Sequence, residues 1–312
     1  MINLDFDQFG RIYDAKNVVE QIRGKGQTFK ILDVGGYRGN TVELFPRDEV
    51  LIVDQYNVKS KNYRKADALN LPFADGEFDI VLSFDVFEHI GEAMRSTYLK
   101  ELTRVSSLVT VIAAPFRSVE NEKAENLSNN FYKNITGKNH PWLIEHIENR
   151  LPKEADVVKF LDKNKLDYKV LNNNDIVNWN YMQHYILLSS IDSTLPGLTN
   201  TNRFYNENIL SLENTGQESY RKIFVIGDQK KLTMKPQNKP KSIITQLELT
   251  DKIFLDIAGS MTDKNKTIRA QTKQISLLHD DNKYITNSVS WKITKPLRAA
   301  KKIFKLLSGR LS

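Results

Sequence analysis

The sequence predicts an α/β fold built on a doubly wound parallel sheet, and three observations support this prediction. Short apolar runs bounded by turn residues recur over the first 228 residues, helical patterns separate several of them, and a glycine-dense turn (ILDVGGYRGN, 31–40) follows the first run. Strands that alternate with helices form right-handed βαβ units, and such units build this kind of sheet.

Four of the apolar runs are expected to be buried strands: FKILDV (29–34), EVLIVD (49–54), FDIVLSF (78–84) and LVTVIAAP (108–115). Between the last two, residues 91–105 carry one apolar stripe at helical spacing. Two later strands are predicted at 166–171 and 220–228. The connection between them, residues 172–219, is too long for a bare loop, so we expect a folded insertion or lid before the last strand.

The chain changes character after the predicted domain, residues 1–228. Residues 229–242 are rich in Lys and Gln and contain two prolines, which indicates a linker. From 243 to 290 an apolar seven-residue repeat predicts a coiled coil, and through it a homo-oligomer. A single long helix lying on the preceding domain is the alternative. The a positions of the repeat are Leu247, Phe254, Met261, Ile268, Ile275, Asn282 and Val289.

Composition and charge argue against several classes of function. The chain has no Cys, so it has neither disulfides nor a thiol nucleophile. The formal charge of +7 equals the charge of the tail, residues 291–312, which holds seven Lys and Arg and no acid. The rest of the chain is therefore formally neutral, which argues against nucleic acid as the partner. No run reaches the ~18 apolar residues of a membrane span, and export is not expected from the acidic N-terminus.

The glycine-dense turn is predicted to place backbone N–H groups beside the carboxyl ends of the strands, where open α/β sheets bind ligands. A dinucleotide loop, G-x-G-x-x-G, needs small residues where this chain has Tyr37 and Asn40. An acid, Asp33, also precedes the first glycine, and a carboxylate in the crevice would repel a pyrophosphate. The turn therefore favours a ligand that carries an ammonium group.

With Asp33, Gly35 and Gly39 the turn resembles the first motif of class I S-adenosylmethionine-dependent methyltransferases, an acid followed by three spaced glycines, and Tyr37 departs from it at the middle glycine. Segments similar to later parts of that family follow in order. The resemblance implies a Rossmann-like methyltransferase sheet with S-adenosyl-L-methionine as cofactor, its ribose on Asp54 and its adenine on Asp67. The residues that it implies for cofactor binding are Asp33, Gly35, Gly36, Gly39, Asp54, Asp67, Ala68, Phe84 and Asp85.

The acceptor side is predicted in GKNHPWLIEHIENRLP (137–152). A hydroxyl acceptor needs a base within hydrogen-bond reach, and we predict His140 or His146, with Glu145, as catalytic residues. An ordinary solvated helix is the alternative, and His89 is expected to be structural. His140 and His146 are six residues apart, which does not suit ligands on one helix face, so no metal site is predicted.

The tail, NSVSWKITKPLRAAKKIFKLL (287–307), resembles a C-terminal signature of enzymes that assemble bacterial surface glycans. It is expected to form a basic amphipathic helix in a membrane interface, or a helix docked on protein. The resemblances predict a cytoplasmic methyltransferase, in peripheral contact with the membrane, acting on a glycan or sugar-linked acceptor in cell-surface polysaccharide biosynthesis. A methyltransferase for RNA or a small molecule, and a non-catalytic scaffold organised by the coiled coil, are the alternatives.

Overall fold

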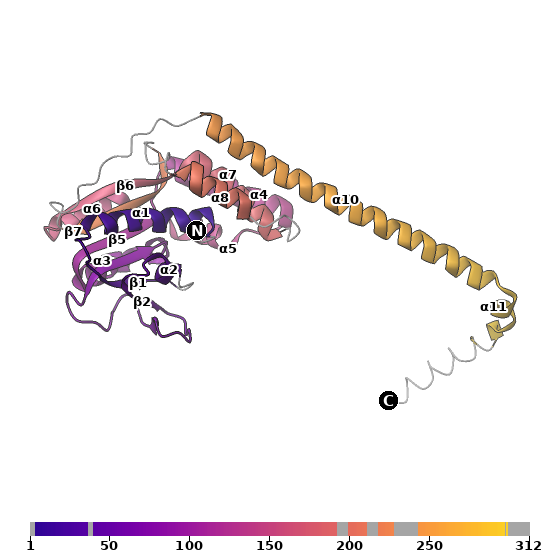
Figure 1. The fold of residues 1–312 in the computed structure, drawn as a ribbon, viewed down its shortest axis with the longest axis horizontal. Helices are drawn as coiled ribbons and strands as arrows, with labels where there is room; N and C mark the ends of the chain where they lie inside the picture. Colours follow the sequence, from indigo (N-terminus) through magenta and orange to yellow (C-terminus); the bar gives the residue numbers. More distant parts are fainter. Residues whose placement is uncertain are drawn as a thin grey trace. The chain divides into compact units, whose positions relative to one another are not determined.

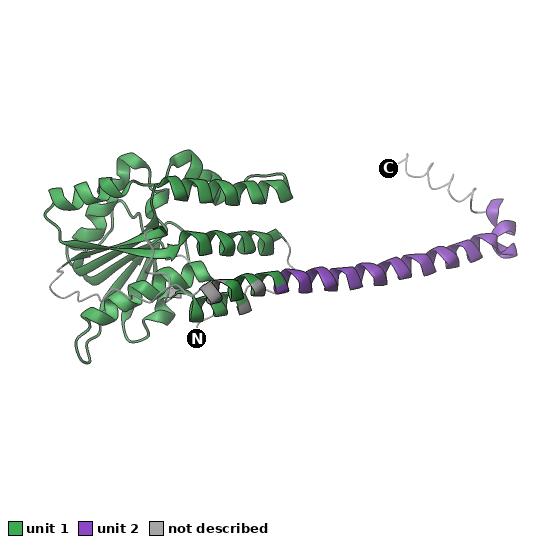
Figure 2. Cartoon of the chain, turned by 90° about the horizontal axis from the view of Figure 1, so that it is seen from above, with its two compact units in different colours: residues 1–254 green, residues 255–312 purple. Residues whose placement is uncertain are grey.

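The computed structural model describes residues 4–36, 40–191, 199–210, 218–227, 243–296 and 298. The chain divides into two compact units, Met1–Phe254 and Leu255–Ser312 (Figure 2). The predicted linker and most of the predicted basic tail lie outside the described residues.

Unit 1 is built around a seven-stranded sheet with helices on both faces (Figure 1). The strands lie in the order β3-β2-β1-β4-β5-β7-β6, and the first five run parallel to their neighbours. The mixed sheet with its flanking helices confirms the predicted α/β fold. Its strands are β1 (Lys30–Val34), β2 (Glu49–Asp54), β3 (Tyr63–Lys65), β4 (Phe78–Phe84), β5 (Ser106–Pro115), β6 (Tyr168–Asp175) and β7 (Ser219–Gly227).

The last strand of the chain, β7, differs from the parallel arrangement that the sequence predicts. β7 pairs antiparallel with both β5 and β6. The reason is the path of the connection, because Asp175 at the end of β6 pairs with Ser219 at the start of β7. The chain leaves and re-enters the sheet at the same edge, so no crossover takes place and β7 must run backwards. The start of β7 therefore lies beside the carboxyl ends of the parallel strands.

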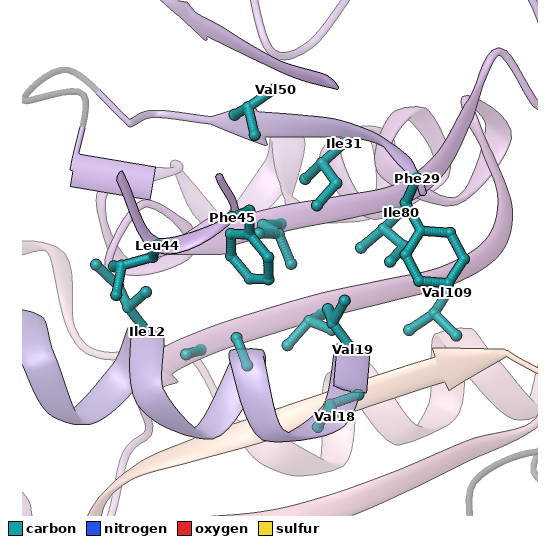
Figure 3. Packing of buried hydrophobic residues seen from close by; sticks show 14 of the residues in the cluster. Ile12, Val18, Val19, Phe29, Ile31, Leu44, Phe45, Val50, Ile80 and Val109 are labelled. Carbon is teal, nitrogen blue, oxygen red and sulfur yellow. The ribbon is translucent and has the colours of Figure 1, made fainter. Parts of the chain in front are cut away.

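Two apolar layers cover the faces of the sheet. On one face, α1 (Phe6–Ile22) and α2 (Asn40–Leu44) pack on the strands, and Figure 3 shows Ile12, Val18 and Val19 of α1 turned toward them. On the other face lie α3 (Arg95–Arg104), as the apolar stripe predicts, and α6 (Glu154–Lys163). These layers bury the strands on both sides, which explains their continuous apolar runs.

A third apolar cluster joins helices from distant parts of the sequence. α4 (Val119–Thr136), α7 (Ile176–Ile191) and α8 (Thr199–Asn208) contribute to it, so the described part of the segment between β6 and β7 is folded. Its centre is Trp179, whose ring stacks on that of Tyr220 with 3.6 Å between centroids. Because Tyr220 belongs to β7, this contact fixes the helices against the edge of the sheet where the parallel strands end.

The heptad segment is helical, as predicted. It forms one long helix, α10 (Ile243–Asn287), which is followed by the short α11 (Val289–Ile293). Within unit 1, Leu249 of α10 is buried in the Trp179 cluster. The apolar a positions are exposed, with values from 56% at Ile268 to 72% at Val289. Among the described residues, no helix combines the length and the apolar character needed to cross a bilayer.

Candidate active site

The turn after β1 favours glycine at two positions, for different reasons. Gly35 has a φ of 88°, and a Cβ added there would come within 2.2 Å of the Val86 side chain. A Cβ on Gly36 would come within 2.1 Å of a carboxylate oxygen of Asp33. Asp33 is buried, and the hydroxyl of Thr41 donates a hydrogen bond to it. The turn therefore places bare backbone directly against a buried carboxylate. The predicted site residue Gly39 lies outside the described residues.

Two further predicted carboxylates follow the neighbouring strands. Asp54 ends β2, and its Oδ1 accepts a hydrogen bond from the Tyr56 backbone N–H at 3.3 Å. Asp67 is exposed, and its Oδ1 accepts from the Leu69 backbone N–H at 2.9 Å, with Ala68 half-buried between them. Both bonds are internal to the loops, so each carboxylate is held at the carboxyl edge of the sheet by its own turn.

Phe84 and Asp85 lie at the end of β4, next to β1, but the Asp85 carboxylate is engaged in ion pairs. Arg221 of β7 binds it through two bonds of 2.6 and 2.7 Å, and Arg11 of α1 donates to it as well. Burial raises the pKa of Asp85, but Arg11 and Arg221 outweigh it and hold the pKa at about 2. The side chain thus ties three elements together, and its contact with a cofactor stays a prediction.

A second polar cluster lies beyond β4 and centres on Glu125 of α4. Its Oε1 accepts hydrogen bonds from the Tyr220 hydroxyl at 2.8 Å and from His146 Nδ1 at 2.9 Å. His146 lies on α5 (Pro141–Asn149), which begins at proline as the sequence predicts. Glu145, on the same helix, accepts from His89 Nδ1 at 3.1 Å, and His89 belongs to the short helix η1 (Phe87–His89).

Two buried atoms in this cluster lack a hydrogen-bond partner within the described part of the chain: Oε2 of Glu88 and Nε2 of His146. Burial, reinforced by Asp85, raises the pKa of Glu88 to about 8. Burial lowers the pKa of His146, but the carboxylates of Glu125, Glu88 and Asp85 outweigh it and raise that pKa overall. Unpaired buried polar atoms are costly, so these two require an explanation.

His140 caps the start of α5 with an extended backbone, as its position before Pro141 predicts. Its ring meets the edges of Tyr132 and Trp142, with centroids at 5.0 and 5.6 Å. Burial and the neighbouring His146 lower the pKa of His140, so it is neutral at pH 7. Trp142 is 61% exposed, which leaves a broad aromatic surface beside this neutral imidazole.

The structure brings most of the predicted residues to one edge of the sheet. Asp33, Asp54 and Phe84 come from three adjacent strands, and Glu145 and His146 come from a helix beyond them. Sequence reasoning missed Arg11, Glu125, Tyr220 and Arg221. The one available signal was the polar start of β7, where Tyr220 and Arg221 precede Lys222 and an apolar run.

A hollow of about 500 Å³ lies at the opposite, amino edge of the sheet, between Ile22 of α1 and Gly227 of β7. Its walls hold mainly aliphatic and hydroxyl side chains, and Asp167 is the charged residue on them. It contains none of the predicted site residues, so the chemistry is expected at the carboxyl edge.

Comparison with known proteins agrees with this geometry. Residues 23–107 match a family model described as Methyltransferase domain. These residues include the strands β1 to β4 and the turn at Gly35. They also include the predicted site carboxylates Asp33, Asp54, Asp67 and Asp85. A search of curated proteins finds no match to this chain.

Solved structures resemble the chain at low identity. A SAM-dependent methyltransferase from Thermotoga maritima is 12% identical with a TM-score of 0.43, and the match covers 71% of this chain and 91% of that one. The magnesium protoporphyrin IX methyltransferase of Synechocystis, solved with SAH, is also 12% identical, with a TM-score of 0.41 and coverage of 71% and 85%. A SAM-dependent methyltransferase from Archaeoglobus fulgidus is 12% identical with a TM-score of 0.41, and the match covers 70% of this chain and 92% of that one. At these values the likenesses carry no argument about substrate.

The matched residues build the first strands of a Rossmann-like sheet, so the chain contains a methyltransferase domain. S-Adenosylmethionine is the methyl donor that the resemblance of the glycine-dense turn implies. The residues present fit this cofactor, since the bare backbone of Gly35 and Gly36 follows the carboxyl end of β1 and lies against the buried Asp33 carboxylate.

Proposed function

We propose that this methyltransferase modifies a glycan or sugar-linked acceptor during cell-surface polysaccharide assembly. The observation that carries the proposal is the neutral His140 beside the exposed ring of Trp142. An aromatic face suits stacking against a sugar ring, and a neutral imidazole suits removal of a hydroxyl proton. The resemblance of the tail to surface-glycan enzymes supports the same class of acceptor.

The chain's own residues have separate tasks in such a reaction. S-Adenosylmethionine supplies an electrophilic methyl group on a sulfonium. Asp33 attracts the ammonium group of the cofactor and Asp54 accepts hydrogen bonds from its ribose, and together they orient it. His140 takes the proton from the acceptor hydroxyl, and Trp142 positions the sugar. Positioning of this kind supplies much of the rate enhancement of a direct displacement.

The experiment that tests the proposal is transfer of a labelled methyl group from S-adenosylmethionine into cell lysates. Label should enter a polysaccharide or lipid-linked sugar fraction from polysaccharide-positive cells and be absent with polysaccharide-negative cells. The His140→Gln variant should reduce transfer by about 10²–10⁴-fold, the usual contribution of a general base. Label that enters RNA, and is removed by ribonuclease, would overturn the acceptor class.

The affinity for the cofactor is expected to fall below pH 6. Burial raises the pKa of Asp33 to about 6, although Thr41 and Arg11 act against it. Below that pH the carboxyl group is neutral and no longer attracts an ammonium, so each further pH unit weakens binding about tenfold. Calorimetry at pH 7.5 and pH 5.0 should give a Kd about tenfold weaker at the lower pH.

Asp33→Asn is the matched control for this pH dependence. Its affinity should be low at both pH values, because an amide has no proton to lose. If the variant keeps the full pH dependence of the wild-type chain, another group titrates and Asp33 does not hold the ammonium.

We also propose that α10 pairs with a second copy of this chain. The seven-residue repeat supports this, since its apolar a positions are exposed along a helix of 45 residues. Ile268→Asp places a charge in the expected seam and should shift the chain from oligomer to monomer in light scattering. Lys273→Asp, at the outward f position, should leave the oligomer intact. A wild-type chain that is monomeric would contradict the pairing.

A further inference from the structure

Three side chains beyond β4 form a group that no assigned role explains. Glu88, His89 and His146 each offer one ligand atom, and these atoms all lie within 4.8 Å of one another. Glu88 and His89 are neighbours on η1, whereas His146 comes from α5. The rings of the two histidines lie close together, tilted by 48° with 5.1 Å between centroids. One carboxylate and two imidazoles form a donor set used by zinc enzymes and by some iron enzymes.

The hydrogen bonds of the two histidines use Nδ1 of each ring, so Nε2 is the nitrogen available to a metal. His89 Nδ1 binds Glu145 at 3.1 Å, and His146 Nδ1 binds Glu125 at 2.9 Å. A metal-bound histidine usually donates its second N–H to a carboxylate, which fixes the ring and makes the other nitrogen a better ligand. Both histidines have such a carboxylate partner on Nδ1, which leaves Nε2 of each ring as the candidate ligand atom.

Two of the three ligand groups are buried without a partner. Oε2 of Glu88 and Nε2 of His146 make no hydrogen bond within the described residues, and Glu88 is only 3% exposed. Two buried polar atoms are therefore left unsatisfied, which costs free energy. A cation between them would satisfy both. His89 is about one-third exposed and leaves a path from solvent.

The local charge also favours a cation. The carboxylates of Glu125 and Glu145 each contact one of the two rings, and the nearby Arg221 and Arg11 guanidiniums are already paired with Asp85.

We infer that Glu88, His89 and His146 form a binding site for a divalent transition-metal ion, with zinc the best match to the donor set. Three protein ligands leave at least one coordination position open, as in catalytic rather than structural zinc sites. Ligand distances of about 2.0–2.2 Å require small rotations of the three side chains toward the ion.

The open coordination position suggests a role for the metal ion in methyl transfer. This role rests on the proposed function, whereas the metal binding itself does not. An acceptor hydroxyl that fills this position becomes a stronger acid, and its proton passes to His140 or to water. The acceptor oxygen then forms the new bond to the methyl carbon as the bond from that carbon to the sulfonium sulfur breaks. The cofactor leaves as a neutral sulfide, so charge and atoms balance.

The test measures metal binding in the absence of any methyl acceptor. The full chain, stripped with a chelator, is titrated with zinc by calorimetry and with cobalt by visible absorption. One ion should bind per chain, with the cobalt bands of low-coordinate nitrogen and oxygen ligands. His146→Gln and Glu88→Gln should weaken zinc binding by about a hundredfold or more, a loss at least as large as that known for outer-shell partners.

Matched variants keep the test decisive. His279→Gln removes an exposed histidine of α10 and should leave the affinity unchanged, since this residue is far from the group in sequence and lies on another element. His89→Gln changes a partly exposed side chain, so it should fold normally and still lose affinity. The inference is overturned if the wild-type chain binds no stoichiometric ion, or if all three site variants bind as it does. Methyl transfer that fails while zinc binds would refute the proposed function alone.

Discussion

Replacing Arg221 with alanine is expected to destabilise unit 1 by about 3–5 kcal/mol, because it removes a buried charge that pairs with both Asp85 and Asp7. Arg221 is 3% exposed and binds Asp85 through two hydrogen bonds, Asp7 at 2.7 Å and Asn174 at 2.9 Å. Urea denaturation should show the loss directly.

An exposed ion pair supplies the control for this experiment. Arg47 is 66% exposed and pairs with Glu20 at 3.0 Å, so Arg47→Ala should cost less than about 1 kcal/mol. The combined variant Arg221→Met with Asp85→Asn should recover part of the loss, since it removes the buried charge together with its partner. If Arg221→Ala costs no more than Arg47→Ala, the network does not stabilise the fold.

The same network determines an acid dependence. The pKa of Asp85 is lowered to about 2 in the folded chain, so its contribution to stability is complete above its ordinary pKa, near 4. That contribution is lost as the pH falls from about 4 toward 2. In Arg221→Ala much of this dependence should disappear, because Arg221 is one of the two groups that lower the pKa.

The fold could be predicted where sequence and tertiary structure agree. β2 and β4 occupy the predicted residues, since each is an apolar run that ends in a turn. β6 runs on to Asp175, past the predicted end at Leu171, although Asn and Asp are poor strand formers. Pairing of Asn172 and Asn173 with β7 overrides their local preference. The antiparallel direction of β7 depends on that same pairing and leaves no local pattern.

The candidate site was predictable at the strand ends and unpredictable beyond them. A turn with an acid and glycines has a local pattern, because the backbone requires glycine at Gly35 and the nearby Asp33 carboxylate disfavours a side chain at Gly36. The polar cluster around Glu125 has no such pattern, since α4, α5 and β7 each contribute one residue. The sequence argument against a metal considered ligands on one helix face, and it could not detect a group divided between η1 and α5.

Asp54→Ala is expected to abolish detectable binding of S-adenosylmethionine. If Asp54 accepts hydrogen bonds from both ribose hydroxyls, its removal costs two charge-assisted bonds of about 1.5–3 kcal/mol each, which corresponds to a Kd at least about a hundredfold weaker. The carboxylate ends β2 and is held by the Tyr56 backbone rather than by a structural ion pair. The substitution should therefore leave the melting temperature almost unchanged, and calorimetry reports binding alone.

The control is Asp281→Ala, which removes an exposed carboxylate from α10 and should bind the cofactor normally. Asp54→Asn separates charge from shape, because an amide oxygen still accepts one hydrogen bond and should retain intermediate affinity. Normal binding by Asp54→Ala would mean that the donor does not lie across the ends of β1 and β2. Since the proposed roles of Asp33 and His140 both assume that placement of the cofactor, this one measurement decides whether the carboxyl edge of the sheet is the active site.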